Sequence, residues 1–250
     1  MIGKRYLLGL ALALLSPAWL ATQADDLNDN WNDGDWADLM VELPPAGGEL
    51  TITEVTLSRA ERLAEAHRQA DSALAAGDWA RAEYRLAQAL AEYHDAHDTR
   101  LRLAAMQFGR GALEQARVLL QQGLELEPDH ADMRLALARL LAEQARYAAA
   151  FRVLDEISPP LAAHLDYYSL KAEMARRSDR CALAVVLYQR LLAQSSGVGA
   201  WWLSLGLCQQ RLGEDFIPSY RQALASADLG NASLRFVEQQ LEHHGTAQTH

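Results

Sequence analysis

Residues 201–206 read Trp-Trp-Leu-Ser-Leu-Gly, and this stretch sets the register for most of the chain. Trp202, Leu205 and Gly206 match the W-x2-L-G pattern that opens a helical repeat about 34 residues long. Moving back from Gly206 in steps of 34 residues reaches only small side chains, at Ala172, Ala138, Ala104 and Ala70. Five small residues at one phase of the period predict a tandem array of similar units.

A second set of small residues recurs with the same period. It consists of Ala82, Ala116, Ala150 and Ala184, and four positions after each stands a large apolar residue: Leu86, Leu120, Leu154 and Tyr188. Where two antiparallel helices cross closely, no volume is left for a large side chain, so a small residue must lie at the contact. The bulky residue then fills the neighbouring gap. Each unit is therefore predicted to be a hairpin of two helices.

The period divides the chain into five predicted units. Their boundaries are 63–96, 97–130, 131–164, 165–198 and 199–228. The fifth unit is shortened between Gly213 and Tyr220, and Pro218 stands where the pattern places its small residue. Proline is tolerated only in the first turn of a helix, so the second helix of this unit is expected to start near Phe216 and to be short.

Capping signals mark both ends of the predicted repeat domain, which spans residues 58–243. Ser58 followed by Glu61 is a capping box, which stabilises the start of a helix. Asn231 can cap a last helix over 231–243, whose apolar face consists of Leu234, Val237 and Leu241. Such a helix closes a repeat array by covering its last apolar surface.

The predicted fold class is therefore all-α, a right-handed superhelix of helical hairpins with a C-terminal capping helix. No strand-like alternation of useful length follows Leu57. Residues 244–250 are predicted to be a disordered tail.

The first 24 residues have the composition of a secretory signal peptide. Lys4 and Arg5 precede an apolar run over 6–15, and Ala24 is the predicted cleavage site. An uncleaved short anchor is the alternative, although roughly 20 apolar residues are needed to span a bilayer and this run is shorter. Both interpretations place the repeats in the periplasm, either free or tethered to the inner membrane. Cleavage would remove two positive charges and change the formal charge from -10 to -12.

Residues 25–57 are predicted to be an acidic, largely disordered linker. No Lys or Arg stands between Arg5 and Arg59, whereas Asp and Glu are frequent, and such segments bury too little apolar surface to fold. Trp31 and Trp36 are unusual in a segment of this kind. One hypothesis is that the linker docks on the groove of the repeat domain when no partner is bound.

Composition and motifs argue against several classes of function. A net charge of -10 does not suit nucleic acid, because binding phosphate needs a concentrated cationic face. The sequence has no Gly-rich phosphate loop, no nucleophile elbow, no His-Glu-x-x-His and no Cys-x-x-Cys. We therefore predict no enzyme activity, no metal, no cofactor and no small-molecule substrate. The predicted partner is a protein or an extended peptide.

The repeat signature resembles that of tetratricopeptide repeat proteins over about residues 63–243. The resemblance implies a superhelix that binds other proteins. Within that group, Trp201-Trp202, Leu205-Gly206-Leu207 and the stretch 234–241 are similar to the biogenesis protein family of mannose-sensitive haemagglutinin (MSHA) pili, a type IV pilus system. This narrower resemblance implies a periplasmic scaffold that assists assembly of an envelope machine.

One feature departs from the pilus family. That family is expected to carry a cytoplasmic segment and a membrane anchor ahead of its linker, whereas this chain begins with a signal-like segment. A general periplasmic adaptor for other envelope or cytochrome maturation is therefore an alternative. From a different class, a regulatory subunit of an envelope hydrolase is also considered.

The first helix of each unit is expected to line the concave face of the array. The candidate partner-binding residues on this face are His67, Arg68, Arg102, Phe108, Arg139, Glu173, Arg176, Trp201 and Leu207. The arginines indicate a groove that grips carboxylates or an acidic peptide with fork-shaped donors. Arg176 lies in a last helical turn, where the helix dipole favours a cation in any case. Trp202 and Gly206 are expected to be structural, and Trp201 to be free to meet a partner.

Cys181 and Cys208 are the two cysteines of the chain. Cys181 starts the second helix of the fourth unit, and Cys208 lies near the end of the first helix of the fifth. In an antiparallel stack these ends lie at the same edge. A disulfide, expected in an oxidising compartment, and a pair of buried thiols are both consistent with this placement.

Overall fold

The structure, a computed structural model, describes residues 56–247 of the chain. The predicted signal peptide (1–24), nearly all of the predicted linker (25–57) and the last three residues lie outside the described residues. Within the described range, no helix is both long enough and apolar enough to cross a membrane.

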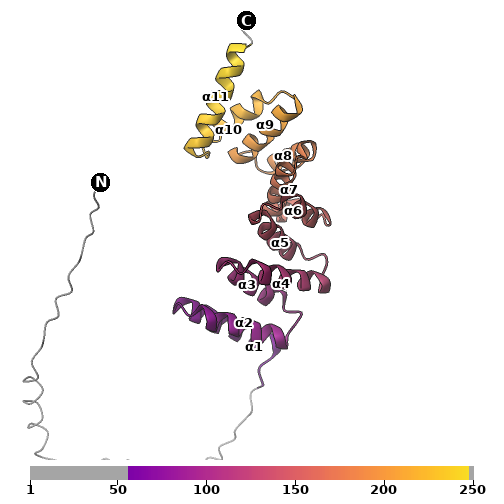
Figure 1. Ribbon diagram of the computed structural model, residues 1–250, viewed down its shortest axis with the longest axis vertical. Helices are drawn as coiled ribbons and strands as arrows, with labels where there is room; N and C mark the ends of the chain where they lie inside the picture. Colours follow the sequence, from indigo (N-terminus) through magenta and orange to yellow (C-terminus); the bar gives the residue numbers. More distant parts are fainter. Residues whose placement is uncertain (1–55, 248–250) are drawn as a thin grey trace, which may run out of the picture. The chain divides into compact units, whose positions relative to one another are not determined.

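Residues 56–247 form α-helices and no strand. The helices are α1 (Arg59–Ala75), α2 (Trp79–Glu92), α3 (His97–Gly109), α4 (Leu113–Leu126), α5 (Ala131–Glu143), α6 (Tyr147–Asp155), α7 (Leu165–Arg177), α8 (Cys181–Gln194), α9 (Gly199–Leu212), α10 (Ile217–Ala225) and α11 (Asn231–Ala247), with a short 3-10 helix, η2 (Leu161–Ala163), before α7. Each odd-numbered helix up to α9 packs against the next even-numbered one, and the five hairpins follow one another from α1 to α10 (Figure 1). The predicted fold of five hairpins and a final capping helix is confirmed.

The odd-numbered helices form the inner side of the stack. Besides packing within its own hairpin, α3 contacts α5, α5 contacts α7 and α7 contacts α9. Among the described residues, the even-numbered helices make no contact of similar extent with one another. The hairpins are therefore closer together on the side of the odd-numbered helices, which places those helices on the concave face, as predicted.

Small side chains lie at the helix contacts, where the period of the sequence places them. Ala82, Ala116, Ala150 and Ala184 are all fully buried, and so are the large residues four positions after each. In the last hairpin the close approach is tighter, because a Cβ atom at position 206 would lie 2.5 Å from the ring of Tyr220. Only glycine fits at Gly206 without displacing that ring.

Two buried arginines, Arg100 and Arg134, join consecutive structural units. Arg100 donates to the main-chain oxygens of His94 (2.5 Å) and Leu119 (3.3 Å). Arg134, one repeat later, donates to the equivalent oxygens of Pro128 (2.7 Å) and Val153 (3.0 Å). The two arginines thus satisfy the carbonyl groups of His94 and Pro128 in the connections between units, and each also reaches a carbonyl group of the second helix of its own unit. Neither arginine is among the residues predicted above, although their spacing of 34 residues equals the repeat period.

The start of the domain and its shortened hairpin agree with the prediction. Ser58 and Glu61 form both hydrogen bonds of the capping box at the start of α1. Helix α10 begins directly after Phe216, with Pro218 in its first turn, and is only nine residues long.

The end of the domain differs from the prediction. Helix α11 continues to Ala247, so the predicted end of the capping helix at His243 is too early. The ring of His244, one residue after the predicted end, packs against that of Phe216, with 4.7 Å between ring centroids. Val237 in the same helix is fully buried, as a capping helix requires.

Candidate functional site

The three arginines predicted to grip a partner are each paired with a carboxylate of this chain. Arg68 contacts Glu65 at 2.5 Å within α1. Arg102 of α3 contacts Asp71 of α1 at 3.0 Å, and Arg139 of α5 contacts Asp166 of α7 at 3.0 Å. The positive charge of each guanidinium is thereby balanced inside the protein. These ion pairs weaken the case for an arginine groove that grips acidic peptides, which stays a prediction.

Glu173 and Arg176 belong to a second, less exposed charge cluster. Glu173 accepts hydrogen bonds from Arg176 (2.6 and 2.8 Å), from Arg177 (2.6 Å) and from the hydroxyl of Tyr188 (3.0 Å). Burial alone would raise the pKa of Glu173, but the hydrogen bonds from the arginines outweigh it and lower that pKa. The cluster therefore ties α7 to α8, and its two arginines share a single carboxylate.

The aromatic residues at the start of α9 are both engaged. The indole of Trp202 donates to the main-chain oxygen of Ser196 at 2.7 Å, consistent with its predicted structural role. The indole of Trp201 donates to the hydroxyl of Ser169 at 2.9 Å and packs against the main core, so it joins α9 to α7. Trp201 is thus anchored by its indole N–H while its side chain stays partly exposed, and its contact with a partner stays a prediction.

Two further residues predicted on this face, His67 and Leu207, are only partly exposed. The ring of His67 lies 2.8 Å from the hydroxyl of Thr99, which joins α1 to α3. Burial, followed by the positive charge of Arg102, lowers the pKa of His67, so the neutral ring is favoured. Leu207 is half-buried in α9.

Phe108 lies instead at an open hollow between α3 and α5. The hollow has a volume of about 510 Å³, and 38% of the surface of Phe108 is exposed there. Most of its lining is apolar: Leu101, Ala104, Ala105 and Phe108 of α3, Ala116 and Leu120 of α4, and Leu135, Ala136 and Leu140 of α5. We call this hollow the α3–α5 groove.

Two alanines explain why the groove opens at this point of the array. At the repeat position of Ala105, the other units carry Asp71, Arg139, Glu173 and Leu207. At the repeat position of Ala136, the other units carry Arg68, Arg102, Leu170 and Ser204. The second and third units thus lack the larger side chains that occupy the concave face elsewhere. The sequence does contain this difference, but it is found only when the side chains at equivalent positions of the units are compared for size.

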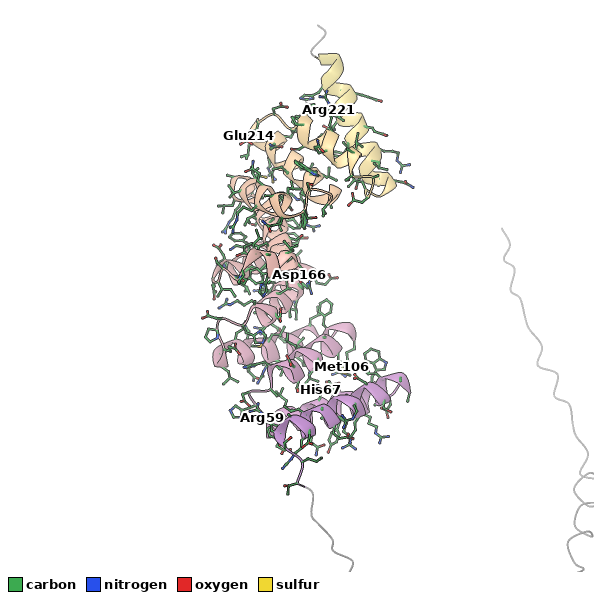
Figure 2. The ribbon with its side chains drawn as sticks, turned by 180° about the vertical axis from the view of Figure 1, so that it is seen from behind. Arg59, His67, Met106, Asp166, Glu214 and Arg221 are labelled. Carbon is green, nitrogen blue, oxygen red and sulfur yellow. The ribbon has the colours of Figure 1, made fainter. Side chains whose placement is uncertain are left out.

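Three charged residues border the groove. They are Asp132 in the first turn of α5, and the ion-paired Arg139 and Asp166. Figure 2 shows Asp166 midway along the stack, between His67 toward one end and Glu214 toward the other. The groove therefore combines an apolar floor with a polar border, which is the usual make-up of a binding site.

The two cysteines lie together, as their predicted positions imply. Both thiols are buried and free, and they lie close enough to influence each other's ionisation. Burial, followed by the neighbouring Cys181, raises the pKa of the Cys208 thiol, which disfavours its nucleophilic thiolate form. A disulfide between them stays a prediction. In the part of the chain that the structure describes, no three or more His, Cys, Asp or Glu residues are grouped to hold a metal ion.

Comparison with known proteins identifies the repeats. A family model described as "Tetratricopeptide repeat" matches residues 73–125 and 107–174, which lie between the end of α1 and α7. No curated protein matches the chain. Residues 73–174 thus match the tetratricopeptide repeat. The narrower resemblance to the pilus biogenesis family stays a prediction.

Solved structures share the fold at low sequence identity. The MamA protein is 18% identical with a TM-score of 0.59, and the match covers 67% of this chain and 92% of MamA. PilF of Pseudomonas aeruginosa is 17% identical with a TM-score of 0.60, covering 76% of this chain and 89% of PilF. YrrB, described as a TPR protein with an unusual peptide-binding site, is 10% identical with a TM-score of 0.61, covering 73% of this chain and 98% of YrrB. The described residues therefore form a solenoid of the tetratricopeptide type.

Proposed function

We propose that this protein is a non-catalytic scaffold that binds a short segment of a partner protein in the α3–α5 groove. The observation that carries the proposal is the apolar hollow left by Ala105 and Ala136 on the concave face, beside the exposed ring of Phe108. Its volume of about 510 Å³ lies within the range of about 300–1,000 Å³ that is common for ligand sites.

The size of the groove indicates how much of the partner it holds. Burying one side chain of the size of Leu or Phe stabilises a complex by roughly 1.5–3 kcal/mol. A micromolar complex needs about 8 kcal/mol, so one anchor in the groove is not sufficient. The bound segment therefore extends over several residues along the concave face, with one apolar side chain inserted between α3 and α5.

We further propose that the partner belongs to an exported assembly machine such as a type IV pilus. The signal-like residues 1–24 support an exported location, and the resemblance around Trp201 to Gly206 supports the pilus. PilF has a similar fold. If this proposal holds, pilus components should be enriched when the native protein is isolated from its host, and an Ala136→Arg variant should enrich them less.

Filling the groove tests the scaffold proposal directly. Peptides are first selected on the wild-type protein from a random twelve-residue library displayed on phage. Ala136→Arg introduces the residue that stands at the same repeat position as Arg68 and Arg102, so the helix should fold normally. We expect this variant to lose at least tenfold in affinity for the selected peptides, measured by fluorescence anisotropy, because the arginine occupies the hollow.

The matched control is Ala87→Arg, which places the same side chain at an exposed position of α2, away from the groove. It should bind the peptides like the wild type. Selected peptides that bind Ala136→Arg as tightly as the wild type would show that the groove is not the binding site.

A further inference from the structure

The negative charge at the border of the α3–α5 groove is not balanced within the protein. Of the three charged residues there, Arg139 and Asp166 cancel each other in an ion pair of 3.0 Å. Asp132 is exposed, and its carboxylate makes no ion pair or hydrogen bond with any other described residue. One uncompensated carboxylate thus faces an otherwise apolar hollow.

The repeat itself shows what is missing at Asp132. Asp132 and Asp166 occupy the same position of consecutive units, and so do Ala105 and Arg139. One unit earlier, the positions equivalent to this ion pair are held by Ala105 and Asp132. The carboxylate is present there, but alanine stands in place of the arginine, so no ion pair forms. The hollow beside Ala105 is the space that this arginine side chain would fill.

From this comparison we infer that the groove binds a basic side chain of the partner segment. This side chain pairs with Asp132 in the same way as Arg139 pairs with Asp166. The partner is thus a peptide segment with an arginine or lysine next to an apolar anchor. The basic group pairs with Asp132, and the apolar side chain packs against Phe108 and Leu135. This inference rests on the proposed function, because it specifies the ligand of the same groove.

The charges of the repeat domain are compatible with this choice of partner. Residues 56–247 hold 24 Asp and Glu against 21 Lys and Arg, a formal charge of -3, and Arg68, Arg102 and Arg139 on the concave face are already paired with carboxylates. The attraction of a cationic group to the groove therefore comes from Asp132 itself, and it weakens as salt is added.

The test uses the peptides selected on the full chain from the twelve-residue phage library. We expect them to be enriched in Arg or Lys beside an apolar residue. Asp132→Asn, which keeps the shape of the side chain and removes its charge, should weaken their binding about tenfold and reduce its salt dependence. Replacing the basic residue of a selected peptide by Ala should weaken binding to the wild type but hardly change binding to Asp132→Asn.

Asp98→Asn is the matched control, because Asp98 occupies the same repeat position one unit earlier and does not line the groove. It should leave the affinity unchanged. Peptides that lose affinity on Ala136→Arg, but carry no excess of basic residues and bind Asp132→Asn normally, would overturn this inference and leave the scaffold proposal standing. Peptides that are insensitive to Ala136→Arg, or a failure to select any peptide, would overturn both.

Discussion

Gly206 shows at the scale of one residue how the array is held together. The position belongs to the series that runs through Ala70, Ala104, Ala138 and Ala172, all of them buried. It differs from them because the ring of Tyr220 lies where a Cβ atom would be. The shortened fifth unit thus brings an aromatic ring unusually close to the preceding helix, and the absence of a methyl group makes room for it.

Gly206→Ala should therefore destabilise the protein, although alanine is the better helix former. The added Cβ would meet the Tyr220 ring at 2.5 Å, and overpacking of a tight contact typically costs about 1–3 kcal/mol. The free energy of unfolding, measured by urea denaturation, is expected to fall by about that amount.

Gly109→Ala provides the comparison, because a Cβ atom at Gly109, the last residue of α3, meets nothing within 4 Å. It should stabilise the protein by up to about 1 kcal/mol through helix propensity. Equal effects of the two substitutions would contradict the packing described at Gly206.

The ion pairs between helices on the concave face could not be predicted from the sequence. Arg102 pairs with Asp71, and Arg139 with Asp166, although the partners lie 31 and 27 positions apart. Whether two such long side chains meet depends on their reach across the concave face, which the repeat period alone does not give. For this reason the repeat period predicts free arginines and does not predict the groove beside them.

Helix α11 is the element whose role is most clearly separate from that of the repeats. Its buried Val237 and the rings of Phe236 and His244 cover Phe216 and Tyr220 at the end of the last hairpin. Without this cover, the aromatic side chains of Phe216 and Tyr220 would face water. The sequence predicts the apolar face of the capping helix. It does not predict the contact of His244 with Phe216, because a single histidine belongs to no periodic pattern.

Removing α11 should loosen the end of the array and spare its middle. In a chain shortened to residue 230, we expect faster amide hydrogen exchange in α9 and α10, whereas exchange in α3 to α6 stays unchanged, because repeats depend mainly on their neighbours. A chain lacking only residues 248–250 is the control and should exchange like the full protein. Uniformly faster exchange along the whole array would argue against this local role.

At the scale of the molecule, the five hairpins share one plan but present different surfaces. The period of small and large residues was sufficient to predict the hairpins, their order and the concave face, because helix packing leaves few alternatives at those positions. The binding surface lies at the positions that packing does not constrain, where Ala105 and Ala136 replace longer side chains. Such differences between units are weak in sequence, yet they decide where a partner can fit.

Hydrogen exchange with and without a selected peptide shows whether the peptide binds between α3 and α5. With saturating peptide, we expect slower exchange of the amides of α3 and α5, and unchanged exchange in α8 and α10. The Ala136→Arg variant should show no such protection under the same conditions. Protection confined to other helices, or equal protection in Ala136→Arg, would contradict the account.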